Sequence, residues 1–277
     1  MLADLHMHST VSDGWRDPDE VADLAADHGV RLMALTDHDS FYGVSRAKAT
    51  AHRRGLGYLP AVEITTYPPS QMRHILGHGV DIHHAQLLAL LRRSQLVLRR
   101  QAEAWIGLLQ DSGIGRELGL LALSHKPMLM PGAVLKLVLQ HRLMTEKNAW
   151  NSIRQAVDGL PSQTYSTMPS PQEAIEAVHA AGGFAVHAHP GSVPDQDLMR
   201  EVLPFLDGLE VYTRRHSPDQ VTTYEELADQ HGLPRTVGTD FHGFNEEPYT
   251  APKARLDRRY LERIWARVEW PALKHAV

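Results

Sequence analysis

Residues 4–14 read DLHMHSTVSDG and place His6 and His8 at the end of a short apolar stretch. Side chains of a β-strand alternate between its two faces, so residues two apart lie on the same face. A strand over residues 2–8 therefore presents both imidazoles on one side, and Asp13 follows five residues later. Two imidazoles with a nearby carboxylate are typical of the start of a metal site.

Similar groups of imidazole and carboxylate side chains recur along the chain, mostly at the ends of short apolar runs. They are Thr36-Asp37-His38-Asp39, Val62-Glu63-Ile64, Arg73-His74-Ile75-Leu76-Gly77, His187-Ala188-His189 and Gly238-Thr239-Asp240-Phe241-His242. A parallel α/β barrel builds its active site from side chains at the ends of several strands. The sequence therefore predicts that these groups meet at one end of a sheet.

The composition limits the class of protein and the kind of metal site. With 277 residues, 43% hydrophobic and 22% charged, the chain fits a globular α/β domain with an insert. No apolar run is long enough for a membrane span, and the N-terminus carries no secretion signal, so we expect a cytoplasmic protein without a membrane partner. The absence of cysteine leaves imidazole and carboxylate as metal ligands, which suits Mn, Zn or Fe. The net charge of −5 gives no overall attraction for long nucleic acid.

The order of strand and helix patterns predicts a parallel sheet with right-handed crossovers. Strands are expected at residues 2–8, 30–36, 59–64, 74–80, 184–189, 208–212 and 234–239, and helices at 19–28, 45–54, 173–181 and 219–232. Residues 83–163 are instead rich in Leu, Arg and Gln at helical spacing, so they are interpreted as a helical insert between a domain of residues 1–82 and 164–277. Four tryptophans are interpreted as core or interface packing rather than as base-stacking platforms. They are Trp105, Trp150, Trp265 and Trp270.

Taken together, the motifs resemble the PHP (polymerase and histidinol phosphatase) family of metal-dependent phosphoesterases, and within it the small nucleotide phosphatases and short-RNA exonucleases. The matching segments are DLHMHSTVSDG (4–14), ALTDHDS (34–40), AVEIT (61–65), HILG (74–77), AGGFAVHAHPG (181–191), GLEVY (208–212) and VGTDFH (237–242). The resemblance implies a distorted (β/α)7 barrel with a helical insert and two or three divalent metal ions at its mouth.

Carried over by position, the resemblance implies nine metal ligands. They are His6, His8, Asp13, His38, Glu63, His74, His189, Asp240 and His242. In the family arrangement, His6, His8, Glu63 and Asp240 hold one metal, Glu63 bridges to a second held with His74 and His189, and Asp13, His38 and His242 serve a third.

Such a centre predicts hydrolysis of a phosphate ester by a metal-activated hydroxide. Clustered cations lower the pKa of a bound water and neutralise the phosphoryl oxygens. A protonated group must then assist the leaving alkoxide. Asp39, Asp37 and His125 are the candidates, and Asp37 and Asp39 are equally well explained as loop caps or as groups that orient the His38 imidazole.

Substrate contacts depart from the resemblance. Close relatives carry an arginine before a histidine in the insert, whereas this chain has Leu123-Ser124-His125-Lys126. We therefore predict that His125 and Lys126 contact substrate, together with Arg214 and Arg215 after a later strand. The expected substrate is a small phosphorylated molecule: a nucleotide, a cyclic phosphate or a sugar phosphate.

Three alternatives stay open at this point. The first is a 5′–3′ exonuclease that acts on short oligonucleotides. The second is hydrolysis of C–N bonds, although amidohydrolases usually bridge their metals with a lysine where this chain has Glu63. The third is a binding module without activity, against which the complete ligand set argues.

Overall fold

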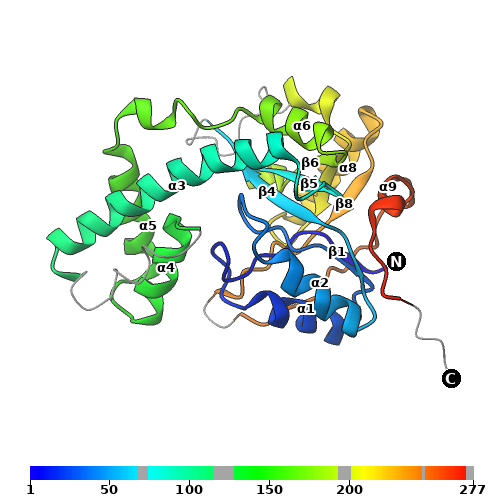
Figure 1. Ribbon diagram of the computed structural model, residues 1–277, viewed down its shortest axis with the longest axis horizontal. Helices are drawn as coiled ribbons and strands as arrows, with labels where there is room; N and C mark the ends of the chain where they lie inside the picture. The colour runs from blue at the N-terminus through cyan, green and yellow to red at the C-terminus, as the bar shows by residue number, and fades with distance from the viewer. Residues whose placement is uncertain (68–73, 115–127, 193–200, 245–246, 273–277) are drawn as a thin grey trace.

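The computed structural model describes residues 1–67, 74–114, 128–192, 201–244 and 247–272. It is a mixed α/β structure in which helices pack around two sheets and a group of helices extends to one side (Figure 1). The α/β class is as the sequence predicts.

The first sheet includes Asp4, the first residue of the N-terminal motif. It contains three parallel two-residue strands in the order β1 (Ala3–Asp4), β2 (Leu32–Met33) and β3 (Gly57–Tyr58). The helices α1 (Pro18–Asp27) and α2 (Val44–Arg53) connect these strands and pack against each other. This part of the chain follows the predicted alternation of strand and helix.

The second sheet corrects the expectation of an all-parallel sheet. Its order is β4 (Ala61–Thr65), β5 (His74–His78), β6 (Phe184–His187), β7 (Gly208–Tyr212) and β8 (Arg235–Val237). The strand β5 runs antiparallel to both of its neighbours, whereas β6, β7 and β8 are parallel. Residues 66–73 between β4 and β5 are fewer than the dozen or so that a parallel crossover needs, so β5 must return antiparallel.

The described strands do not form the closed barrel that the sequence led us to expect. Two isolated parallel bridges, Met7–Phe241 and His38–Glu63, connect the two sheets instead of continuous ladders. The chain leaves extended geometry at the same end of the sheets, because Asp39, His189 and Asp240 have φ angles of 50°, 28° and 52°. Asp39, His189 and Asp240 therefore belong to bends rather than to regular strands.

Three further helices surround the sheets. α6 (Pro171–Ala180) packs on β5 and β6, α8 (Pro218–Gln230) packs on β7, and α9 (Arg258–Ile264) contributes Tyr260 and Ile264 to the core. Both α6 and α8 begin with a capping box, in which Ser170 and Ser217 accept the N–H of the residue three positions later. Short 3₁₀ helices occupy Ser162–Tyr165, Pro190–Ser192, Leu203–Phe205 and Trp265–Arg267.

Among the described residues after β5, helices predominate up to residue 158, in line with the helical pattern of the sequence. α3 (Ala85–Asp111), α4 (Pro131–Gln140) and α5 (Glu146–Asp158) pack together beside the sheets (Figure 1). The first half of α3 contributes Leu87 and Leu91 to the core over the second sheet, while its second half contributes Trp105 and Leu109 to a separate cluster with α4 and α5. One long helix therefore connects the sheet core to the helical group.

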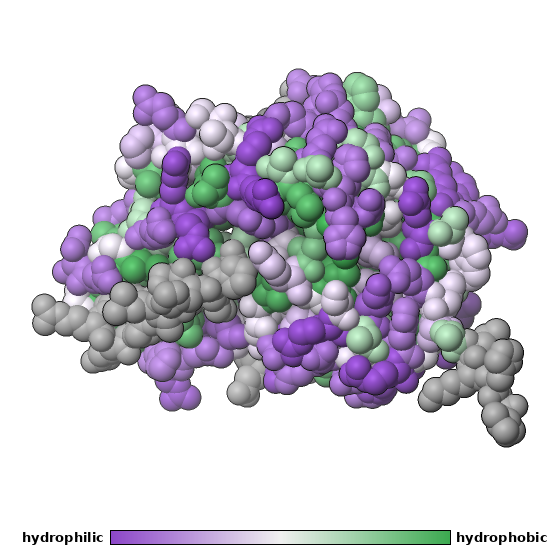
Figure 2. All heavy atoms as spheres, in the orientation of Figure 1, coloured by the Kyte–Doolittle hydropathy of each residue, from purple (hydrophilic) through white to green (hydrophobic). Residues whose placement is uncertain are grey.

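None of the described helices has the length and apolar character that a membrane span requires. On the face shown in Figure 2, apolar side chains are visible as small patches among hydrophilic ones.

Candidate metal centre

The first group of site residues comes from the two ends of the chain. Met7 pairs with Phe241, which extends the strand alternation beyond β1 and turns His6 and His8 to the same side. Their Nε2 atoms lie 3.1 Å apart, and each is within 3.3 Å of an oxygen of both Glu63 and Asp240. All four side chains are buried and lie close enough together to hold one metal ion.

Glu63 on β4 lies between this group and a second one. Its Oε2 faces His6 and His8, while its Oε1 lies 2.7 Å from His74 Nδ1 and 3.1 Å from His189 Nε2. Burial alone would raise the pKa of this carboxyl, but the surrounding imidazoles, His38 foremost, hold it well below the usual range. Glu63 is therefore an anion whose two oxygens face different sets of imidazoles.

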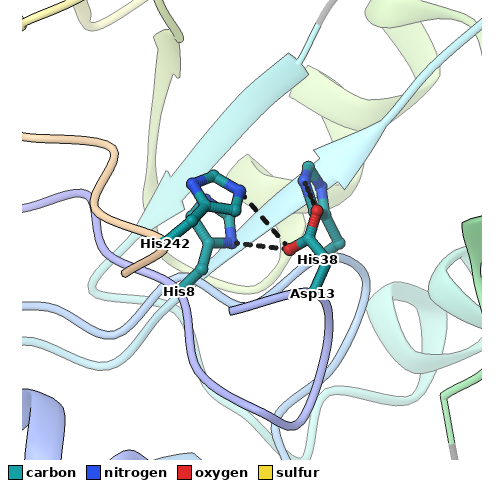
Figure 3. Close-up of side chains that lie close together, drawn as sticks. All are labelled: His8, Asp13, His38 and His242. Atoms are coloured by element: carbon teal, nitrogen blue, oxygen red, sulfur yellow. Dashed lines mark ion pairs between the residues drawn. The ribbon is translucent and has the colours of Figure 1, made fainter. Parts of the chain in front are cut away.

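A third group surrounds Asp13, which projects from the loop after His8 (Figure 3). Its carboxylate lies 3.4 Å from His242, 3.8 Å from His8 and 3.9 Å from His38. The rings of His8 and His242 stack with their centres 4.2 Å apart. His8 thus faces two groups, and all nine residues predicted as ligands lie in one continuous cluster.

The donor set fits divalent cations. Imidazole nitrogens and carboxylate oxygens from all nine residues crowd together with no lysine or cysteine among them. Within the described residues, the buried atoms His74 Nε2 and His189 Nδ1 have no hydrogen-bond partner. Buried polar atoms without partners are costly, and nitrogen and oxygen ligands of this kind suit Zn, Mn or Fe. The cluster therefore has the composition expected of a site for several metal ions.

Glu210 on β7 is a site residue that sequence reasoning missed. Its Oε1 accepts a hydrogen bond from His6 Nδ1 at 2.9 Å, and its Oε2 accepts one from the backbone N–H of His189 at 2.7 Å. The carboxylate thereby directs the Nε2 lone pair of His6 towards Glu63 and Asp240. The available signal was an acidic residue at the centre of the apolar strand GLEVY, where it is fully buried.

Two other buried carboxylates hold the loops that carry predicted ligands. Asp4 accepts hydrogen bonds from the backbone and hydroxyl of Thr239 and from the Tyr249 hydroxyl, and its burial raises its pKa to about 6. Asp37 accepts hydrogen bonds from the backbone and hydroxyl of Ser9 and from the Ser12 hydroxyl. Asp37 therefore caps the loop that presents Asp13, which favours the loop-cap alternative.

Asp39 is fully buried next to His38 in the chain. Its carboxylate accepts the N–H of Thr65, and burial raises its pKa to about 7. It is not among the described residues that line the cavity over the site. Its role as a proton donor stays a prediction.

The two predicted arginines contact the site directly. Arg215 forms an ion pair with the Asp240 carboxylate, and Arg214 donates to the Asp240 carbonyl at 3.0 Å while it pairs with Glu247. Both line the cavity, but whether they contact substrate stays a prediction. His125 and Lys126 lie outside the described residues.

A cavity of about 1010 Å³ opens over the cluster. Most of the predicted ligands line one side of this cavity, and residues of the helices α3, α4 and α5 line its other side. Trp150 lines this second side and keeps 47% of its surface exposed, whereas Trp105 is fully buried. Core packing thus holds for Trp105 but not for Trp150, because α5 turns that side chain towards the cavity rather than into the helical cluster, and interface packing of Trp150 stays a prediction.

Comparisons with known proteins show which proteins this chain is similar to. The PHP domain matches residues 4–108. The 3′,5′-nucleoside bisphosphate phosphatase of Chromobacterium violaceum is 32% identical over 97% of this chain and 98% of its own length. A 5′–3′ exoribonuclease of Haemophilus influenzae is 31% identical over 86% of this chain and 89% of its own length. A solved structure from Chromobacterium violaceum, described as an amidohydrolase with bound sulfate and no metal, covers both chains completely with a TM-score of 0.77 and 29% identity.

Proposed function

Because the chain belongs to the PHP family, we propose that it is a metal-dependent phosphoesterase that hydrolyses a small phosphorylated substrate: a nucleotide, a cyclic phosphate or a sugar phosphate. The observation that carries this proposal is the position of Glu63. Its two oxygens face two different sets of imidazoles, as expected of a carboxylate shared by two cations.

The proposed centre holds two or three divalent ions of Mn, Zn or Fe. Three overlapping groups support this number. They are His6, His8, Glu63 and Asp240; His38, Glu63 and His74, with His189 beside Glu63; and His8, Asp13, His38 and His242. Divalent cations held there supply Lewis acidity, which lowers the pKa of a water and neutralises charge on the phosphoryl oxygens.

The protein's own residues orient this chemistry. Glu210 fixes the ring of His6, while Asp37 and Asp4 fix the loops of Asp13 and Asp240. Arg214 and Arg215 place positive charge at the rim of the cavity, where a phosphoryl group enters. We keep Asp39 and His125 as the proposed proton donors and Lys126 as a proposed substrate contact.

Two structural expectations belong to the same proposal. The bridges Met7–Phe241 and His38–Glu63 support a distorted barrel in which the two sheets together surround the site. The cavity wall formed by α3, α4 and α5 supports a role for residues 83–163 as a cap over its mouth.

A 5′–3′ exonuclease for short oligonucleotides is the second candidate, favoured by the exoribonuclease relative. One experiment separates the candidates: release of phosphate and of nucleotides by the metal-loaded protein from mononucleotides, nucleotide bisphosphates, sugar phosphates and a 5′-phosphorylated oligonucleotide. The proposal predicts phosphate release from the small monoesters or ring opening of a cyclic phosphate added to the same panel, and it fails if metal-loaded protein does neither.

A further inference from the structure

The imidazole of His189 depends on its own backbone for its position. Its Nε2 lies 3.1 Å from Glu63 Oε1, while its Nδ1 has no hydrogen-bond partner among the described residues. The ring of His6, in contrast, is fixed by a hydrogen bond from its Nδ1 to Glu210. The backbone of His189 has a φ angle of 28°, and such a conformation persists only where the surrounding groups hold it. The segments on either side of His189 therefore decide where this imidazole lies.

The segment after His189 is held by His216, which follows the strand β7. The backbone N–H of Gly191 donates to His216 Nε2 at 3.0 Å, and His216 Nδ1 lies 2.9 Å from the Val211 carbonyl oxygen. An amide N–H can only donate and a carbonyl can only accept, so Nδ1 carries the proton and Nε2 carries the lone pair. The ring is buried against Tyr224, and burial lowers its pKa, which favours this neutral form. One neutral imidazole therefore connects two loops.

Gly191 fits against His216 because it has no side chain. A Cβ at this position would lie 2.7 Å from both His216 Cδ2 and Gln220 Nε2. The Gln220 amide donates to the Gly191 carbonyl at 3.2 Å, and its oxygen accepts the N–H of Ser217 at the start of α8. His216 and Gln220 thus bind both backbone polar groups of Gly191, so the segment after the metal ligand has a fixed position relative to α8.

The other hydrogen bond of His216 fixes the turn that carries the two arginines of the cavity rim. The His216 backbone N–H donates to the Thr213 carbonyl at 3.3 Å, and its ring Nδ1 donates to the Val211 carbonyl. Arg214 and Arg215 are the two middle residues of this closed turn, and both line the cavity. The same imidazole therefore contacts the segment of a predicted metal ligand through one nitrogen and supports a cationic turn through the other.

We propose that His216 is a positioning residue with two separate tasks: its Nε2 holds the segment that carries His189, and its Nδ1–H holds the turn of the two arginines. This role rests on the proposed phosphoesterase function and adds a residue that acts through the backbone of its neighbours. Replacement of His216 should therefore change the affinity for metal and for an anion, each through a different ring nitrogen.

Three substitutions separate these tasks, because each keeps part of the hydrogen bonding. The amide of His216→Asn can still donate to the Val211 carbonyl from near the position of Nδ1, but it is too short to reach Gly191. His216→Gln can place its oxygen near the position of Nε2 and accept the Gly191 N–H, but it has no donor at the position of Nδ1. Gln220→Glu removes the donor to the Gly191 carbonyl, while its carboxylate still accepts the Ser217 N–H.

Two affinities are measured for each variant. Competition with a metal-sensitive chelator gives the affinity for Mn²⁺, and calorimetric titration with inorganic phosphate at saturating Mn²⁺ gives the affinity for an anion. His216→Asn and Gln220→Glu should lower the affinity for at least one Mn²⁺ ion roughly 10–100-fold and leave phosphate binding unchanged. His216→Gln should do the reverse, with unchanged Mn²⁺ affinity and phosphate binding that is several-fold weaker.

Matched controls are His231→Asn and His231→Gln, which replace an exposed histidine at the other end of α8. Neither control should change either affinity. The proposed role is overturned if the two His216 variants alter both affinities to the same extent, as a merely structural role predicts, or if they behave like the controls. Gln220→Glu leaves His216 in place, so it still decides whether the Gly191 contact supports metal binding if a His216 variant does not fold.

Both affinities can be measured without turnover, which separates this role from the proposed function. If metal-loaded wild type hydrolyses no phosphate ester, the proposed function fails, while the two affinities still test His216. Loss of Mn²⁺ affinity in His216→Asn and in Gln220→Glu would then support the role of His216. Unchanged Mn²⁺ affinity in both variants would contradict it, whatever the activity of the protein.

Discussion

The Glu210 carboxylate accepts a hydrogen bond from His6 Nδ1 at 2.9 Å, with both side chains fully buried. Because the proton of His6 is held on Nδ1, its Nε2 faces the carboxylates and imidazoles of the proposed metal centre. Gly238 makes this arrangement possible, since a Cβ at that position would lie 2.6 Å from Glu210 Oε1 and 2.3 Å from His6 Cβ.

Glu210→Gln should therefore weaken metal binding without unfolding the protein. An amide at this position can present its NH₂ group to His6 and loses the charge that strengthens the hydrogen bond, so metal affinity should fall roughly 10–100-fold. Competition with a metal-sensitive chelator measures this affinity. Glu226→Gln, on the exposed side of α8, is the matched control. Equal metal affinities in the two variants would show that Glu210 does not contribute to metal binding.

Metal binding should release protons at neutral pH. Burial alone would lower the pKa of His8, but hydrogen bonds and charge from Asp240 and Glu63 raise it to about 10 in the metal-free protein. His8 is therefore protonated at pH 7, whereas an imidazole ligand must be neutral, so a cation has to displace at least one proton. Affinity should consequently increase as pH rises from 6 to 8.

Calorimetry in buffers of different ionisation enthalpy counts these protons. Mn²⁺ or Zn²⁺ added to chelator-treated protein should give a heat that depends on the buffer. The His8 prediction would be wrong if the heat were the same in every buffer.

Gly132 at the start of α4 sets the distance between the helices and the metal centre. A Cβ added there would lie 2.5 Å from Asp13 Cβ and 2.8 Å from Asp13 Oδ2. Gly132→Ala should push α4 away from Asp13, raise KM several-fold and reduce occupancy of the group around Asp13. Gly107→Ala on α3 is the matched control, because a Cβ at that position meets nothing within 4 Å. Identical metal content and KM in the two variants would show that α4 can adjust without consequence.

The protein should prefer small substrates to long nucleic acid. Binding of a polynucleotide requires many phosphate contacts in a basic groove. The chain carries a net charge of −5, and the cavity combines Arg154, Arg214 and Arg215 with Glu146 and Glu247. Under one buffer, kcat/KM for mononucleotides or bisphosphates should exceed that for a 5′-phosphorylated oligonucleotide. The opposite order would assign the protein to the exonuclease side of its family.

The sequence predicted the cluster better than it predicted the sheet. Strand alternation was enough to bring His6 and His8 together, because a period of two is a local property. The antiparallel direction of β5 follows from the length of the loop before it, and the bends at Asp39, His189 and Asp240 interrupt the strands where a closed barrel was expected. The bends depend on how distant segments meet, whereas the short connection before β5 is already visible in the sequence.

Residues that act through other residues were the hardest to find. Glu210 occupies an apolar strand, and its role depends on contacts with His6, which is 204 residues away. The position of Trp150 at the cavity could not be predicted, because the helical pattern of α5 does not reveal whether its apolar face meets a core or a cavity. Both assignments required the three-dimensional arrangement.

The most direct test of the proposed centre is a measurement of divalent metal content and phosphate release on the same samples of wild type, Glu63→Gln and the control Glu226→Gln. Because both oxygens of Glu63 face imidazoles, its replacement should remove more metal than the loss of a single histidine. Wild type and control should hold two or three ions per chain, whereas Glu63→Gln should lose metal and several orders of magnitude in kcat while its circular dichroism stays native. Near-normal turnover and full metal content in Glu63→Gln would contradict the account.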